Sequence, residues 1–244
     1  MKLRHILSAA SAALALMAAA PVLAATITLT SAPYAPASLY GGISVLNASA
    51  PNPTSFGGEA GRFAVTGFDV AAPSTAFNAF TYCVDVFKAV YTSTNYNVSS
   101  LSAIGASADR QGRLAGLLVN SQSLLTSATT DAQRILIAAA TQISVWELVY
   151  ETAGEPLTVS TGNFSVFGDF TPDVSTLANS YLANNWTAPT GLVSSLISVD
   201  GSSQNQIFLR AAVPEPATWL SMLFGFGIVG SALRRAKNRK VAIA

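Results

Sequence analysis

The feature that most constrains the fold of this 244-residue chain is one long helical segment, Thr130–Glu151. Thr130 and Gln133 have the spacing of a capping box, in which two side chains satisfy backbone N–H groups at the start of a helix. Gly154 and Pro156 supply the stop signal. The segment therefore predicts a helix with both ends defined by the sequence.

This helix carries a polar residue on its apolar side. At 3.6 residues per turn, Gln142 falls within the apolar stripe, between Ala139 and Trp146. A buried carboxamide without partners costs about 1–3 kcal/mol, so Gln142 needs compensation from elsewhere in the fold. The same projection gives the two sides of the helix as follows: apolar Ile135, Ala139, Trp146 and Val149, polar Gln133, Ser144, Glu147 and Glu151.

Residues 1–25 have the organisation of a secretory signal peptide. A short basic start, Met1–His5, precedes an apolar, alanine-rich run, and small residues follow up to Ala24 and Ala25. The apolar run is too short for a membrane span. The sequence therefore predicts export through the Sec translocon, with cleavage after Ala24 or Ala25.

Residues 213–244 form a second distinctive segment. Pro214-Glu215-Pro216 precedes an apolar run, Ala217–Leu233, which would reach about 25 Å as a helix. The run predicts one transmembrane helix, and the positive-inside rule then keeps the C-terminus in the cytoplasm. The cations that follow the run are Arg234, Arg235, Lys237, Arg239 and Lys240.

These three parts in this order resemble the PEP-CTERM sorting signal. The resemblance implies recognition by an exosortase in the inner membrane and removal of the helix near Pro214-Glu215-Pro216. It also implies a Gram-negative bacterium that makes exopolysaccharide. The protein is then expected to lie transiently in the inner membrane and finally at the cell surface or in the extracellular matrix.

The region between these ends, residues 26–212, is long enough for one domain with a proper core. Six basic and eleven acidic side chains between Thr26 and Val213 give a net charge of −5, which argues against nucleic-acid binding. The one histidine, His5, leaves with the signal peptide, so no histidine remains for a catalytic triad or a metal site. Cofactors are not expected. The one cysteine, Cys83, has no partner for an internal disulfide.

Alternating and helical patterns divide this domain into strands at both ends and helices in the middle. We therefore predict an α+β fold, a β-sandwich or barrel with a helical insertion. Ser31–Gly58 is rich in Pro, Gly, Ser and Asn and predicts loops around a short strand at Ile43–Leu46. The other predicted strands are Thr26–Thr30, Gly61–Phe68, Phe77–Phe87 and a final hairpin of Val193–Val199 with Gln206–Arg210; the other predicted helices begin at Ser107 and at Thr171-Pro172-Asp173.

Cys83 lies on the predicted strand Phe77–Phe87, on the face opposite its apolar residues. Phe80, Tyr82, Val84 and Val86 form that apolar face, whereas Cys83 shares the other with Thr81 and Asp85. A structural cysteine would more naturally share the apolar face. The position therefore favours a chemical role for the thiol.

Two short motifs share their order and residue types with one known family. They are Tyr82-Cys83-Val84 and, with Gln142 lying 59 residues after Cys83, the segment Thr141–Trp146 followed by Glu147-Leu148. Together they resemble the Cys–Gln thioester domains of bacterial surface adhesins, which have an aromatic-Cys-aliphatic strand motif and a later Gln four residues before a Trp. The resemblance covers roughly Phe77–Glu151.

This resemblance implies an internal thioester between Cys83 and Gln142. The thiolate attacks the carboxamide carbon and ammonia leaves; Tyr82, Trp146 and Ala139 would form the pocket that excludes water. An amine of a surface protein or glycan then attacks the Gln142 carbonyl, forms an amide and frees the thiol. This is single-turnover attachment and not enzyme catalysis. Asp85 is a candidate for proton transfer, with a solvated carboxylate as the alternative.

Two alternatives to the thioester remain open from the sequence. In the first, Cys83 is a lone buried thiol and Gln142 hydrogen-bonds a backbone carbonyl; the protein would then be a passive matrix protein held non-covalently in exopolysaccharide. An enzyme acting on polysaccharide would instead need a carboxylate pair from Glu147, Glu151 and Glu155. Acids four residues apart on a helix usually mark a solvated face, so we expect these to be surface residues.

Overall fold

The computed structural model describes residues 25–46, 54–168, 170, 172–210 and 226, and those between 25 and 210 form one compact unit. The predicted signal peptide, Pro-Glu-Pro motif, transmembrane helix and basic tail lie outside the described residues. Within them the elements are β1 (Thr26–Ser31), β2 (Tyr34–Val45), β3 (Thr54–Asp69), β4 (Ala76–Cys83), β5 (Asn95–Ser100), 3-10 helix η2 (Leu101–Ile104), α2 (Ala108–Ser127), α3 (Asp131–Tyr150), β6 (Phe164–Phe167), α4 (Pro172–Ala183), 3-10 helix η3 (Thr190–Leu192), β7 (Val193–Ser198) and β8 (Gln206–Leu209).

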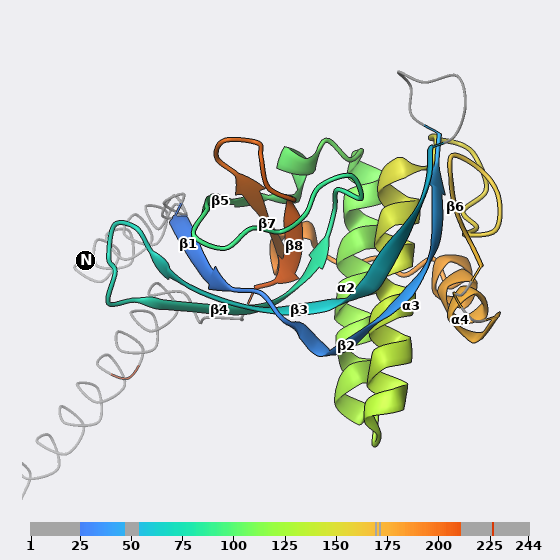
Figure 1. Ribbon diagram of the computed structural model, residues 1–244, viewed down its shortest axis with the longest axis horizontal. Coiled ribbons are helices and arrows are strands. Elements are labelled where there is room, and N and C mark those ends of the chain that lie inside the picture. The colour runs from blue at the N-terminus through green and yellow to red at the C-terminus, as the bar shows by residue number, and fades with distance from the viewer. Residues whose placement is uncertain (1–24, 47–53, 169, 171, 211–225, 227–244) are drawn as a thin grey trace, which may run out of the picture. The chain divides into compact units, whose positions relative to one another are not determined.

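Six strands close into a barrel. The sheet has the order β1-β5-β7-β8-β4-β3-β2-β6, and an additional β1–β3 pairing joins the two ends of the first six strands. All of these pairings are antiparallel. The helices follow β5 in the chain, so the domain is an α+β barrel with a helical insertion (Figure 1). The predicted fold class is confirmed.

Strands β2 and β6 extend this sheet beyond the barrel, and here the loop prediction for Ser31–Gly58 was wrong. β2 spans twelve residues, and its glycines pair with those of β3: Gly41 with Gly58 and Gly42 with Gly57. Aromatic rings lie over these glycines, Phe167 of β6 over Gly42 and Tyr40 over Gly57. A Cβ at either glycine would collide with the ring, so the glycine-rich composition marks close ring packing on a strand and not a loop.

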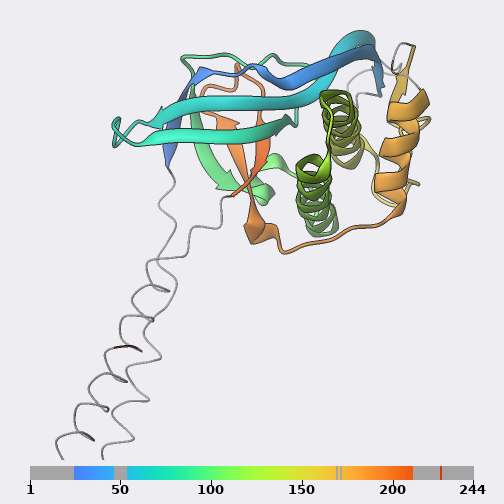
Figure 2. The same ribbon diagram turned by 90° about the horizontal axis from the view of Figure 1, so that it is seen from below.

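The helices α2 and α3 run side by side against the sheet (Figure 2). The predicted capping box is confirmed: the Gln133 N–H donates to the Thr130 hydroxyl, and the Gln133 side chain accepts from the Thr130 N–H. Ser107 likewise caps α2 by accepting from the Arg110 N–H. These local signals explain why both helices begin where the sequence predicts.

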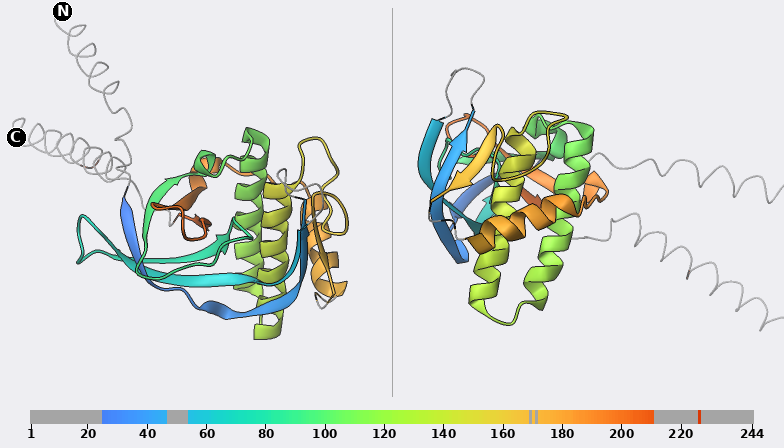
Figure 3. Two further views of the ribbon diagram at one scale, coloured as in Figure 1. Left: turned by 45° about the horizontal axis from the view of Figure 1, so that its top comes forward. Right: turned by 90° about the vertical axis from the view of Figure 1, so that its right-hand side faces the viewer.

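The expectation that one side of α3 is solvated was wrong for its C-terminal half. Every residue from Ala138 to Leu148 is buried. The sheet, α2 and α4 all contact α3, so it is covered on several sides (Figure 3). Ser144 is accommodated because its hydroxyl donates to the Ala140 carbonyl at 2.8 Å.

The other predicted strands were right in place and inexact in length. β1, β7 and β8 match, and the β7–β8 hairpin forms. β4 ends at Cys83, four residues earlier than predicted. β5 and β6 were missed, because one is a polar segment with Tyr96 as its deeply buried side chain and the other has four residues.

The capping box gives a direct test of α3 stability. Replacing Thr130 with Ala removes the side-chain acceptor for the Gln133 N–H, so we expect the free energy of unfolding to fall by about 1 kcal/mol. Urea denaturation followed by circular dichroism measures this loss. T126A on the exposed end of α2 is the control and should change stability by less than about 0.5 kcal/mol. Equal losses in both variants would contradict the role of the cap.

Candidate functional site

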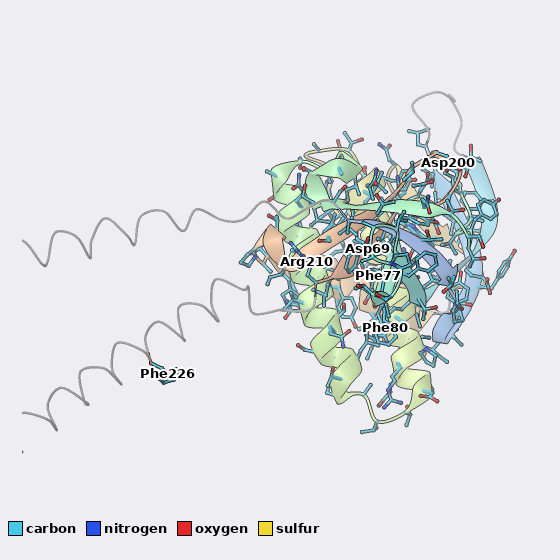
Figure 4. All side chains as sticks on the ribbon, turned by 90° about the vertical axis from the view of Figure 1, so that its left-hand side faces the viewer. Asp69, Phe77, Phe80, Asp200, Arg210 and Phe226 are labelled. Carbon is cyan, nitrogen blue, oxygen red and sulfur yellow. The ribbon has the colours of Figure 1, made fainter. Side chains whose placement is uncertain are left out.

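Cys83 lies at the end of β4 and is buried, with 4% of its surface exposed. The expected division of β4 into one apolar face and one cysteine face was wrong. Thr81, Tyr82, Cys83 and Val84 are all buried, whereas Phe80 is 49% exposed (Figure 4). The Arg62 guanidinium lies over the Phe80 ring, 3.8 Å from its centroid. Both faces of the strand are covered at its end, so burial alone does not set Cys83 apart.

Gln142 contacts the backbone of Cys83 through both ends of its carboxamide. Its Oε1 accepts from the Cys83 N–H at 2.8 Å, and its Nε2 donates to the Cys83 carbonyl at 2.8 Å. The β3–β4 pairing ends at Phe63 with Thr81, two residues before Cys83. The Gln142 side chain therefore takes the place of the missing strand partner. These two hydrogen bonds supply the compensation that the buried carboxamide requires.

The Cys83 sulfur contacts a second glutamine, which the sequence prediction missed. The thiol donates to Gln204 Oε1 at 2.6 Å, and Gln204 Nε2 donates to the Asp85 carbonyl. Cys83 is a free thiol. Burial, and to a smaller extent the nearby Asp85 carboxylate, raises the pKa of the Cys83 thiol well above its usual value. The resting form of the sulfur is therefore the neutral thiol.

A third buried glutamine, Gln206, stands opposite Cys83 in the β4–β8 ladder. Directly paired residues project their side chains to the same face of a sheet, so Gln206 and Cys83 are neighbours. Gln206 Oε1 accepts from the Thr81 hydroxyl, and its Nε2 is buried without a partner. Gln142 and Gln204 thus contact Cys83 directly, and Gln206 is its partner across the β4–β8 ladder. The alternate spacing of the two glutamines in Gln204-Asn205-Gln206 was the sequence signal that could have identified them.

The three residues predicted to form the pocket are buried. Ala139 and Trp146 lie on α3 on either side of Gln142, and Trp146 packs against Phe164 with ring centroids 6.1 Å apart. Tyr82 precedes Cys83 on β4 and therefore points to the other face of the strand. Burial raises the pKa of Tyr82 to about 12.

Asp85 is engaged by its own loop. Its Oδ1 accepts from the Phe87 N–H at 3.0 Å, and its Oδ2 lies 3.4 Å from Lys88 Nζ. The Asp85 carboxylate therefore acts on Cys83 only through its charge. Its oxygens bind groups of the turn that follows β4.

Glu147 and Glu151 are buried, contrary to the expectation of a solvated face. Their carboxylates bind backbone N–H groups of the segment after α3: Glu147 that of Thr158, and Glu151 those of Thr152 and Asn163. Helix projection identified their common side but not the segment that covers it. The two carboxylates fasten this segment to α3.

Burial raises the pKa of Glu147 to about 8, and the Glu151 charge adds to the effect, whereas the Thr158 N–H and Arg110 oppose it. One Glu147 oxygen, Oε2, is buried without a partner. A neutral carboxylic acid at this position avoids an unpaired buried charge.

Comparisons with known proteins add to this geometry. Residues 212–237 match the PEP-CTERM protein-sorting motif. The chain carries a PEP-CTERM sorting signal. This motif implies an exported surface protein that is processed by an exosortase, as the sequence resemblance predicted. No curated protein matches the sequence.

Among solved structures, the chain is similar to the N-terminal domain of the Streptococcus pyogenes pilus tip adhesin Cpa. The two share 12% sequence identity with a TM-score of 0.41, over 72% of this chain and 95% of that chain. In the part of the chain that the structure describes, no helix combines the length and the apolar character needed to cross a membrane. Within the same residues, no cluster of three or more His, Cys, Asp or Glu side chains is placed to hold a metal ion.

The raised pKa of Glu147 predicts a pH dependence of stability. Between about pH 4.5 and pH 8 the unfolded chain releases this proton while the folded domain keeps it, so stability falls as the pH rises and levels off above that range. E147Q removes the titrating group and keeps an acceptor for the Thr158 N–H. We expect the decrease in Tm between about pH 5 and pH 8 to shrink by several degrees in E147Q.

Differential scanning fluorimetry at the two pH values measures this decrease. E155Q, which changes an exposed glutamate of the segment after α3, is the matched control and should keep the slope of the unsubstituted protein. An E147Q slope as steep as that of E155Q would contradict the assignment.

Proposed function

We propose that this exported protein forms an internal thioester between Cys83 and Gln142 and uses it to attach covalently to amine-bearing partners at the cell surface. The observation that carries the proposal is the pair of 2.8 Å hydrogen bonds between the Gln142 carboxamide and the Cys83 backbone. They hold the electrophilic carbon beside the residue that bears the sulfur. Proximity of this kind supplies much of the rate of an intramolecular reaction.

The same contacts support a route for the reaction. The Cys83 N–H already points at Gln142 Oε1, and this oxygen gains negative charge when the sulfur attacks. Preorganised N–H donors stabilise such charge, and a nucleophile's own backbone N–H is a known source. The Cδ–Sγ bond forms, the Cδ–Nε2 bond breaks, and the thiol hydrogen leaves with nitrogen as ammonia. The reaction is stoichiometric, so the protein is not an enzyme in this proposal.

One observation favours a passive matrix protein as the second candidate. Two neutral hydrogen bonds already satisfy the Gln142 carboxamide, so its burial is compensated without a cross-link. In that case the exopolysaccharide would hold the protein non-covalently. A polysaccharide-acting enzyme has less support, because Glu147 and Glu151 are buried and bind backbone N–H groups instead of facing solvent.

The intact mass of the purified protein distinguishes the proposed covalent attachment from the passive matrix role. We expect the purified protein to be lighter by one ammonia than its sequence requires, because ring closure expels the Gln142 nitrogen. C83A and Q142A should each have the full calculated mass. Q122A, which removes an α2 glutamine that bonds Arg62 and not Cys83, is the control and should keep the deficit. A full mass for the unsubstituted protein would favour the passive candidate.

Processing at the PEP-CTERM motif is a separate prediction. Replacing Pro214, Glu215 and Pro216 together with Ala should leave the protein in the inner-membrane fraction with its C-terminal residues intact, because the exosortase no longer recognises it. Cell fractionation with mass spectrometry of the C-terminal peptide measures this. T130A, altered only in the folded domain, should be sorted normally. Release of the triple variant in the normal form would contradict exosortase processing.

A further inference from the structure

The Cys83 carbonyl depends on Gln142 for its hydrogen bond. The Val84 N–H donates to the Asn205 carbonyl at 2.9 Å, so the backbone groups of Val84 point toward β8. Neighbouring residues of an antiparallel strand point these groups to opposite sides, which turns the Cys83 carbonyl away from β8. On that side Gln142 Nε2 donates to it at 2.8 Å.

Thioester formation would remove this donor, because Nε2 leaves as ammonia. The Cys83 N–H keeps its acceptor, since Oε1 stays on the acyl carbon, but the Cys83 carbonyl is left buried without a partner. An unpaired buried carbonyl is unfavourable. A nucleophile that brings an N–H to this position would therefore regain a lost interaction.

We propose that the Cys83 carbonyl oxygen, within the thioester of the proposed function, makes the site selective for primary amines. The amine nitrogen bonds to Gln142 Cδ, the Cδ–Sγ bond breaks, and one amine hydrogen passes to the sulfur. The second hydrogen remains on the new amide and donates to the Cys83 carbonyl, in the place of the Nε2 hydrogen. The ligand class is a primary amine, as on a lysine side chain or an amino sugar.

Secondary amines and alcohols cannot make this contact. A secondary amine gives its single hydrogen to the sulfur, so its tertiary amide has no N–H. An alcohol likewise gives its single hydrogen to the sulfur, and the resulting ester presents only acceptor oxygens to the Cys83 carbonyl. The contact therefore favours primary amines over these two classes of nucleophile.

Competition between two amines tests the proposal in the purified, thioester-containing protein. Methylamine and dimethylamine at equal concentration, at about pH 8, give adducts of different mass. A small-molecule alkyl thioester gives the intrinsic ratio of their rates. We expect the protein to favour methylamine by about tenfold more than this reference, which is the size expected from one hydrogen bond. A ratio equal to the reference would overturn the proposal.

Isopropylamine distinguishes selection by size from selection by the retained N–H, because it is a primary amine that is bulkier than dimethylamine. Isopropylamine should still react faster than dimethylamine, relative to the reference thioester. Rejection of both would show selection by size and would overturn the proposal. A protein without the ammonia deficit would instead overturn the proposed function itself, so the two failures are distinguishable.

A different contact bears on how long the thioester survives. Gln204 Nε2 is committed to the Asp85 carbonyl, so the carboxamide turns its oxygen toward the Cys83 sulfur, 2.6 Å away. The Gln204 N–H, bonded to the Ala89 carbonyl at 2.9 Å, holds the residue in place. The negative end of a fixed dipole therefore faces the sulfur.

We infer that Gln204 slows cleavage of the proposed thioester. Negative charge grows on the sulfur as the Cδ–Sγ bond breaks, and the Gln204 oxygen opposes it. Thiols that take up negative charge more easily are better leaving groups. Gln204 thus acts on the Cys83 sulfur through its dipole and prolongs the lifetime of the proposed thioester bond.

Two Gln204 variants that change the charge beside the sulfur in opposite directions test this role. The measurement is the rate of the methylamine reaction. Q204M keeps the length of the side chain without the dipole and should react several-fold faster; Q204E places a carboxylate beside the sulfur and should react more slowly. A loss of packing alone would change both rates in one direction, which would overturn the inference. S203A loosens the same hairpin without touching the sulfur and should stay within about twofold.

Premature cleavage in Q204M is also informative. If this variant is isolated with a Gln142 carboxylate, the thioester formed and was hydrolysed, which supports faster cleavage. If it is isolated with an intact Gln142 carboxamide, Gln204 is needed for formation, and the inference is wrong. The mass deficit of the unsubstituted protein tests the thioester independently of either result.

Discussion

The two hydrogen bonds between the Gln142 side chain and the Cys83 backbone join α3 to the end of β4. The β3–β4 ladder stops two residues short of Cys83, which leaves the cysteine N–H and carbonyl to find partners elsewhere. A shift of α3 by one turn would leave these groups and the carboxamide unpaired in a buried region, at about 1–3 kcal/mol each. The contact that orients the proposed reaction therefore also favours the observed position of the helix.

The sequence predicted those features that depend on a few neighbouring residues. The cap of α3 follows from Thr130 and Gln133 alone, and the inward position of Gln142 follows from helical periodicity, so both were confirmed. Only the end of β2, from Ile43, was predicted as a strand, because the glycines before it are explained only by rings from elsewhere. Phe167, which covers Gly42, is more than a hundred residues away in the chain. No local pattern carries that information.

The site shows the same division between local and distant causes. Cys83 and Gln142 were identified from motifs, and the structure brings them together, while their cross-link remains a prediction. Gln204 and Gln206 were not identified, because they become significant only when the β7–β8 hairpin aligns with the end of β4. Glu147 was misjudged for a related reason: periodicity gives the side of a helix, but the segment that covers that side comes later in the chain.

The burial of Cys83 restricts what kind of chemistry this site can perform. Burial and the Asp85 charge raise the pKa of the thiol, so little thiolate is available to start a reaction. In the proposed reaction, ring closure would then draw on the fixed approach of the Gln142 carboxamide, whose acceptor oxygen is already held by the Cys83 N–H. The same burial would keep water away from a thioester formed there. A bond that forms once and persists until a partner arrives suits the proposed attachment better than turnover.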